Sequence, residues 1–229
     1  GPKRIVQSGK ISVEKMKKGI FIAVIISICS TLALVFLSLR KDTLGLIIFL
    51  LLGLAAVIAA IKYTVGQNAY GYLGLGDLFV FLFFGLVSVL GSNYLFTSSF
   101  NSLLISPACT IGLLSVGVLN LNNMRDIEND QKSKKNTLAV RLGAFKSKIY
   151  HYFLIFSSIV LMVIFHVQIE NDSVLFLSLI FGNICWLIFH VFKVSKVKSP
   201  KIFDGYLKHL VFSTFFYSII LSIYFFEIF

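Results

Sequence analysis

Charged residues are scarce in this 229-residue sequence: Asp, Glu, Lys and Arg make up only 14% of it, whereas 57% of the residues are hydrophobic. The mean hydropathy is +0.89. A water-soluble domain of this length could not hide so much apolar surface in one core, because its own surface must be largely polar. The composition therefore excludes an ordinary soluble globular protein and predicts that lipid surrounds most of the chain.

Cysteine and histidine are also too few and too scattered to indicate a familiar site. The three cysteines, Cys29, Cys109 and Cys185, each fall within an apolar segment, and their spacing indicates neither a disulfide framework nor a metal site. The four histidines lie near the ends of apolar segments and show no HExxH or HxxxH spacing. We expect packing or interfacial roles for all seven residues.

Apolar runs long enough to cross about 30 Å of hydrocarbon occur seven times along the chain. They cover residues 19–39, 44–61, 78–97, 102–122, 149–168, 173–192 and 207–226. Barrel strands would be about half as long and would alternate apolar with polar side chains, whereas these runs are apolar on nearly every side. The predicted fold class is all-α, a polytopic transmembrane bundle of about seven helices.

The basic residues are distributed unevenly between the two ends of this bundle. Threading seven helices through a membrane places 19 of the 21 Lys and Arg on one side and only Arg40 and Lys41 on the other. The positive-inside rule makes the basic side cytoplasmic, in the cell membrane. The net charge of +11 then reflects topology and attraction to anionic lipid or phosphate, and no nucleic-acid partner is expected.

The interiors of the predicted spans hold no Asp, Glu, Lys or Arg. Ion-coupled transporters usually place such groups at membrane depth, so the pattern disfavours transport, although a transport or scaffold protein is one alternative. Any chemistry is expected at the cytoplasmic ends of the helices, in the segments 62–77 and 123–148.

The segment that follows the fourth predicted span concentrates oxygen ligands and basic side chains. Asn122, Asp126 and Asp130 recur every four residues, so they would share one face if the helix continued for two more turns. Mg2+ is typically held by one or two carboxylates together with the phosphate oxygens of a substrate. Arg125 and the lysines that follow can bind phosphate through charge-assisted hydrogen bonds. The pattern suits a magnesium diphosphate, although an Asp-x-x-x-Asp pair alone is a weak signal because charged loop residues are usually solvated.

The segment 62–77 mixes four glycines with Tyr63, Tyr70 and Tyr72. Glycines let the chain bend freely, and tyrosines present flat aromatic faces to a ligand. An aromatic belt at the membrane interface explains the same composition equally well.

Two stretches of the sequence resemble the UbiA superfamily of intramembrane prenyltransferases. The run from Asn122 to Asp130, with the stretch TLAVRLG at 137–143, is similar to the second aspartate-rich motif of that superfamily. Residues 63–91 and the opening GPKRIVQSGKIS are similar to the branch that prenylates 1,4-dihydroxy-2-naphthoate in menaquinone biosynthesis. The resemblance covers nearly the whole chain.

The resemblance implies a bacterial membrane enzyme that binds a polyprenyl diphosphate through Mg2+, lets the carbon–oxygen bond ionise and directs the allylic cation onto an aromatic acceptor. Asp126 and Asp130 would be the catalytic, magnesium-binding aspartates, with Asn122 as a neighbouring ligand. The other residues that would contact substrate are Arg4, Arg125, Lys135 and Arg141, which are basic, and Tyr63 and Tyr70, which could stack on the acceptor or shield the cation.

Members of this superfamily have nine helices, with a first aspartate-rich motif before the segment that resembles GPKR. The seven predicted spans would be the third to ninth of these helices, so residues 1–229 are expected to form a single domain without the two N-terminal helices. A missing N-terminal half or a second copy of the chain is then an expected partner, besides the lipid bilayer, and the chain alone is expected to show no transfer. Two alternatives stay open: transfer to another aromatic acceptor, such as 4-hydroxybenzoate or homogentisate, and a non-catalytic membrane fragment.

Overall fold

The structure is a computed structural model of the chain, and it describes residues 9, 11–63, 65–66, 69–169 and 173–228, with side chains as far as Phe225. Over these residues the regular structure is helical, and no strand occurs among them. Seven helical segments of this part of the chain are long and apolar enough to cross a membrane. The predicted fold class, an all-α polytopic bundle, is therefore confirmed.

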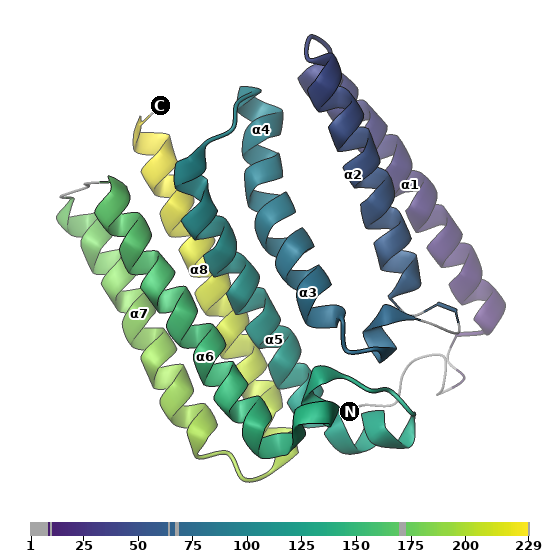
Figure 1. Cartoon of the computed structure of the whole chain (residues 1–229), viewed down its shortest axis with the longest axis vertical. Coiled ribbons are helices and arrows are strands. Elements are labelled where there is room, and N and C mark those ends of the chain that lie inside the picture. The colour runs from purple at the N-terminus through teal and green to yellow at the C-terminus, as the bar shows by residue number, and fades with distance from the viewer. Residues whose placement is uncertain (1–8, 10, 64, 67–68, 170–172, 229) are drawn as a thin grey trace.

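The first two membrane-length helices, α1 (Val13–Leu39) and α2 (Thr43–Lys62), form a hairpin at one side of the molecule (Figure 1). Asp42 caps α2 by accepting a hydrogen bond from the Gly45 N–H at 2.9 Å, and it also accepts one from the Tyr94 hydroxyl at 2.7 Å. These two hydrogen bonds hold the pKa of Asp42 below its ordinary value. The Tyr94 ring stacks on Phe49 with centroids 5.5 Å apart, so α4 (Ser92–Thr97) anchors the hairpin at the end opposite Lys62.

The third membrane-length segment is not one regular α-helix. It consists of α3 (Gly76–Val80), a π-helical stretch η2 (Phe81–Gly91) and α4, and it follows the short turn η1 (Tyr70–Tyr72). A Cβ built on Gly85 would lie 2.7 Å from the carbonyl oxygen of Ala108 and 2.7 Å from the Cα of Gly112. Glycine at both positions therefore lets this segment approach the next membrane helix closely.

The central element is α5 (Ile105–Lys132), which follows the turn η3 (Ser102–Leu104). It packs against the third segment, α6 (Leu138–Ile169) and α8 (Phe203–Ile228), and η4 (Pro200–Ile202) precedes α8. α7 (Val174–Ser195) lies at the outer edge against α6 and α8 (Figure 1). A buried amide fixes the α5–α6 contact, because Asn120 Nδ2 donates to the Ser147 carbonyl at 3.0 Å. Among the described residues, α5 contacts more of the bundle than any other membrane-length helix does.

The predicted 123–148 loop is mostly helical, which corrects the sequence-based boundaries. α5 continues to Lys132 and α6 begins at Leu138, so only residues 133–137 connect the two helices. Hydropathy marks only the part of a helix that lies in lipid, and the polar turns beyond it stay hidden from that measure. α6 contains one backbone break, at Gly143 with φ +73°, which separates its short first segment from the long membrane helix.

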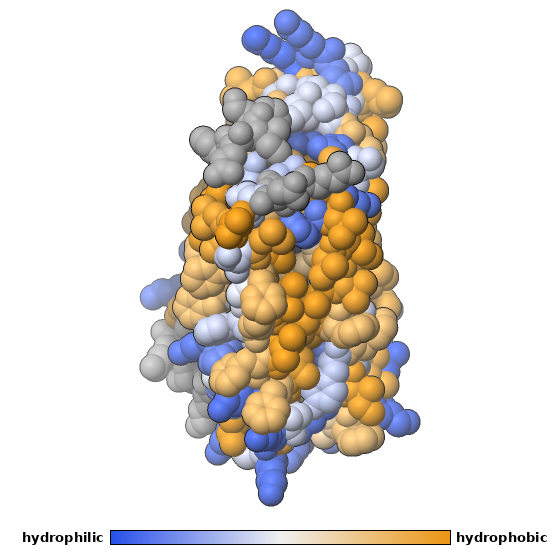
Figure 2. Space-filling model, turned by 90° about the vertical axis from the view of Figure 1, so that its left-hand side faces the viewer, coloured by the Kyte–Doolittle hydropathy of each residue, from blue (hydrophilic) through white to orange (hydrophobic). Residues whose placement is uncertain are grey.

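The outer surface of the bundle is apolar around its middle. Figure 2, which views the side of α7, shows a broad hydrophobic band between hydrophilic ends. Near the end of α7, the Nζ of Lys193 lies 5.0 Å from the centroid of the Phe189 ring. The Nζ of Lys196, the residue that follows the helix, lies 3.8 Å from the centroid of the Phe192 ring. Lysines that extend along exposed aromatic rings towards water are typical of a membrane interface. The chain is a multi-pass membrane protein.

We expect Gly45→Ala to loosen the α1–α2 hairpin. A Cβ at this position would lie 2.1 Å from Asp42 Oδ2 and 3.1 Å from a ring carbon of Tyr94, so the helix cap and the hydrogen bond between these side chains must yield. Thermal unfolding in detergent should show a midpoint at least about 2 °C lower. Gly19→Ala on α1 is the control, because no heavy atom lies within 4 Å of its Cβ position. Equal effects of the two substitutions would contradict this account of the hairpin contact.

Candidate functional site

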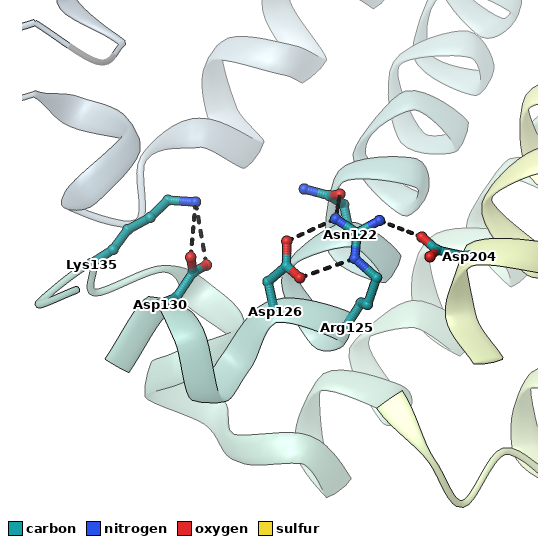
Figure 3. Close-up of polar contacts among 6 residues, drawn as sticks. All are labelled: Asn122, Arg125, Asp126, Asp130, Lys135 and Asp204. Atoms are coloured by element: carbon teal, nitrogen blue, oxygen red, sulfur yellow. Dashed lines mark hydrogen bonds and ion pairs between the residues drawn. The ribbon is translucent and has the colours of Figure 1, made fainter. Parts of the chain in front are cut away.

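We call the end of the bundle where α5 finishes and α6 begins the polar end. Asn122, Asp126 and Asp130 project from the same side of α5 at this end (Figure 3). The four-residue spacing brings them together because α5 remains helical through Lys132. Three side chains with oxygen donors therefore line up along the last three turns of a membrane-spanning helix.

Arg125 is bonded to both of the first two oxygen-bearing side chains. Its Nε donates to Asp126 Oδ1 at 3.0 Å and its Nη2 donates to Asp126 Oδ2 at 2.7 Å, a bidentate pair. The same Nη2 donates to Asn122 Oδ1 at 2.6 Å. Its Nη1 donates to Asp204, which comes from the first turn of α8. Arg125 thus connects the candidate metal ligands to another helix.

Lys135 forms the corresponding pair with the second aspartate. Its Nζ lies 3.2 Å from Asp130 Oδ2 and 3.5 Å from Asp130 Oδ1. The side chains are only 12% and 8% exposed, respectively, so little water can solvate the two charges. A carboxylate in such a place needs a nearby cation. Each candidate magnesium-binding aspartate therefore already contacts a positive charge in the folded chain.

Residues 69–75 pack against the connection between α5 and α6. The backbone N–H of Asn136 donates to the Tyr72 carbonyl at 2.9 Å, and Arg141 Nη2 donates to the Leu73 carbonyl at 2.7 Å. Gly74 has φ +72°, and a Cβ there would lie 3.1 Å from the Asn136 carbonyl oxygen. The guanidinium of Arg141 thus contacts this turn. Its expected contact with a diphosphate stays a prediction.

The two candidate tyrosines lie together beside α3 and α5. The rings of Tyr63 and Tyr70 meet edge to face with centroids 5.4 Å apart, and Tyr70 stacks on Phe79 at 3.9 Å. A Cβ on Gly76 would lie 3.6 Å from the Tyr63 ring and 3.4 Å from Leu119, one turn of α5 before Asn122. Burial raises the pKa of the Tyr70 hydroxyl above its ordinary value. Arg4, the remaining candidate, lies outside the described residues.

An apolar groove of about 590 Å³ extends from this site along the bundle. Its walls come from the third segment, α5 and α8, and they include Val80, Phe84, Ser115, Val118, Leu119, Asn122, Leu207, Val211, Thr214, Phe215 and Ser218. The hydroxyls of Thr214 and Ser218 donate to carbonyls of their own helix at 2.9 and 3.1 Å, so they need no hydrogen-bond acceptor from a ligand in the groove. Between Leu207 and Ser218 the helix rises roughly 16 Å, at about 1.5 Å per residue. The groove suits a flexible hydrocarbon chain whose head group lies near Asn122.

The oxygen donors fit magnesium only if a ligand completes its shell. Among the described residues, no group of three or more His, Cys, Asp or Glu side chains could hold a metal ion. Mg2+ at phosphate sites needs only one or two protein carboxylates, because phosphate oxygens and water supply the rest. Asp126 and Asp130, with the amide oxygen of Asn122, match that requirement.

Comparison with known proteins identifies the family. The model of the UbiA prenyltransferase family matches residues 1–220. The chain belongs to the UbiA prenyltransferase family. No solved structure matches the chain significantly.

Three relatives are named 1,4-dihydroxy-2-naphthoate octaprenyltransferase. The Haemophilus influenzae protein is 48% identical over 155 residues, which cover 68% of this chain and 50% of that protein. The Escherichia coli protein is 45% identical over 168 residues, with 72% and 54% coverage. The Mycobacterium leprae protein is 34% identical over 165 residues, again with 72% and 54% coverage. The chain spans about half the length of these curated relatives.

The sequence did not point to Asp204 as part of this site. The residue lies in the first turn of the last membrane helix, with no motif around it, and it reaches Arg125 across 79 positions of the sequence. An acidic residue at a helix start is ordinarily explained by the helix dipole. Only the packing of α8 against α5 brings it into the site.

Proposed function

We propose that this chain acts in the transfer of a polyprenyl group from a polyprenyl diphosphate to 1,4-dihydroxy-2-naphthoate, with Mg2+, in menaquinone biosynthesis. The observation that carries the proposal is the row of Asn122, Asp126 and Asp130 at the polar end of an apolar groove that Asn122 itself helps to line. A polyprenyl diphosphate has the matching form, a charged head on a long apolar tail. The names of the three relatives support the choice of acceptor.

Different residues would hold different parts of such a substrate. Asp126 and Asp130 would hold the magnesium diphosphate, and bound Mg2+ would supply positive charge that stabilises the diphosphate as it leaves. Arg125 and Lys135 lie next to these aspartates and can donate charge-assisted hydrogen bonds to phosphate oxygens. The groove would align the tail so that its first carbon lies near Asn122. Positioned donors of this kind act on the charge that develops as the carbon–oxygen bond breaks.

Tyr63 and Tyr70 would face the electron-poor carbon that remains. Aromatic faces attract a cation, and the edge-to-face pair at 5.4 Å lies beside Gly76, which also packs against Leu119 of α5. The flat acceptor could stack in the same place before the new carbon–carbon bond forms. In the resembling branch, the acceptor then loses its carboxylate as carbon dioxide.

We propose further that the polar end faces the cytoplasm of a bacterial cell. The uneven distribution of Lys and Arg supports this orientation, since 19 of the 21 belong to this side of the seven spans. Both substrates could then reach the site from the cytoplasm or the inner leaflet.

The main test concerns the two aspartates. We expect Asp126→Asn and Asp130→Asn each to weaken Mg2+-dependent binding of a radiolabelled polyprenyl diphosphate to the purified chain by at least about tenfold, because each amide keeps the shape but loses the charge that holds the metal. In membranes where the chain is co-expressed with a two-helix segment that carries the first aspartate-rich motif, prenylated product should form with 1,4-dihydroxy-2-naphthoate and not with 4-hydroxybenzoate.

Glu128→Gln is the matched control for the aspartate variants, because Glu128 lies on the same helix but is exposed and lies off the shared face. It should bind the diphosphate as the wild-type chain does. Wild-type binding by both aspartate variants would show that these residues are ordinary surface charges. Product formation with 4-hydroxybenzoate alone would refute the proposed acceptor.

The groove yields a separate prediction about the prenyl tail. Val211→Trp should fill part of the groove and weaken binding of a long polyprenyl diphosphate, while binding of inorganic pyrophosphate stays unchanged. Ile188→Trp on α7 is the control, since this side chain is exposed on the bundle surface and does not line the groove. Competition assays against the radiolabelled long substrate measure both effects. Equal loss of pyrophosphate binding in Val211→Trp would contradict a role confined to the tail.

The orientation can be tested by cysteine labelling in intact cells, after Cys29, Cys109 and Cys185 have been replaced. We expect a membrane-impermeant maleimide to miss Ser133→Cys, which lies between α5 and α6, and to label Ser99→Cys at the opposite end. Both positions are exposed, so accessibility differs only through the membrane side. Labelling of Ser133→Cys from outside would reverse the proposed topology.

A further inference from the structure

We propose that Asp204 is a positioning residue of the diphosphate site: it holds the Arg125 guanidinium when a magnesium diphosphate replaces that arginine on Asp126. The inference rests on the proposed function, because it assumes that Asp126 binds the metal. It assigns a role to a residue outside the aspartate-rich motif.

The geometry gives Arg125 two acidic partners on different helices. Nε and Nη2 are directed at Asp126, while Nη1 is directed at Asp204 at the start of α8 (Figure 3). The guanidinium lies between the two carboxylates, with five fixed donors in one plane. It can therefore give up its bonds to one carboxylate and keep its bond to the other without leaving the site.

Binding of a metal at Asp126 requires such a change. Both Asp126 oxygens accept hydrogen bonds from Arg125, so a magnesium ion at this carboxylate must compete for the same atoms. The Arg125 side chain is only 15% exposed, which limits how far water can solvate it once Asp126 is lost. A partly buried charge without a partner is unfavourable. Asp204 offers the displaced guanidinium a carboxylate that the metal does not need.

Asp204 is suited to this role because its own side chain is 58% exposed. Water stabilises the Asp204 carboxylate when Arg125 lies closer to Asp126. Asp204 can therefore pair more closely with Arg125 when a metal occupies Asp126. Exposure also limits the size of the effect, since exposed ion pairs are weak and are screened by salt. Asp204 should therefore shift the apparent metal affinity without being required for binding.

The chain contains a matched control for this charge. Glu128 is exposed, lies three residues after Arg125 on α5, and lines the same cavity of about 750 Å³ as Asp204. The structure gives Glu128 no ion pair within the described residues, whereas Asp204 is paired with Arg125. Glu128→Gln therefore removes one negative charge from the same neighbourhood and leaves the contacts of Arg125 intact.

The experiment is a titration of the purified chain with Mn2+ in the presence of inorganic pyrophosphate, with free Mn2+ measured by electron paramagnetic resonance. Mn2+ stands in for Mg2+ because both prefer oxygen ligands. At low salt, D204N should raise the Mn2+ concentration for half-saturation about threefold to fivefold. The difference should shrink near 1 M salt, where the Debye length falls to about 3 Å. D204E should retain most of the wild-type affinity, and E128Q should bind Mn2+ as wild type does.

The outcomes separate this inference from the proposed function. If the wild-type chain binds Mn2+ with pyrophosphate and D204N matches it, or E128Q is weakened equally, the inference is wrong while the proposed site stands. If the wild-type chain binds no Mn2+ under these conditions, both are wrong. D204S, which keeps a polar side chain in the first turn of α8, repeats the test if D204N proves unstable.

Discussion

The polar end of the bundle depends on the pairing of two carboxylates with nearby cations. Both carboxylates lie at the end of a membrane-spanning helix and are largely shielded from water, so each needs a positive charge beside it. Arg125 and Lys135 supply these charges through pairs with Asp126 and Asp130. The pairs also determine local structure: Arg125 connects α5 to the start of α8, and Lys135 holds the α5–α6 connection against the last turn of α5. The interactions that neutralise the aspartates thus also position the elements around them.

The groove depends on the same central helix. The first turns of α5 have small, apolar residues where they contact other helices. Gly112 packs against Phe81 of the third segment, and Gly117 packs against Leu210 of α8. Its last turns are polar and carry the candidate ligands. Because one continuous helix supplies both parts, the distance between the candidate ligands and the apolar groove is set by helix geometry and not by a flexible loop.

The sequence was sufficient to predict features that depend on local periodicity. Long apolar runs predicted the seven membrane-length segments, and the spacing of Asn122, Asp126 and Asp130 predicted their shared face. The predicted helix boundary was wrong where the hydropathy falls, because the polar last turns of α5 were treated as a loop. The sequence also could not predict contacts that depend on how distant segments pack, such as the Arg125–Asp204 pair or the Arg141 contact with the Leu73 carbonyl.

For the proposed function, the charge balance of this cluster would favour joint binding of metal and diphosphate. With Asp126 on Arg125 and Asp130 on Lys135, the four side chains are together close to neutral. A divalent cation alone would add positive charge beside two displaced bases in a place that water reaches poorly, which is unfavourable. A diphosphate alone would find both bases engaged with carboxylates. If both bound together, the metal would take the carboxylates and the freed bases would contact phosphate oxygens, so that every charge would have a partner. Neutral pairs of this kind disfavour either ion alone and favour the complete substrate.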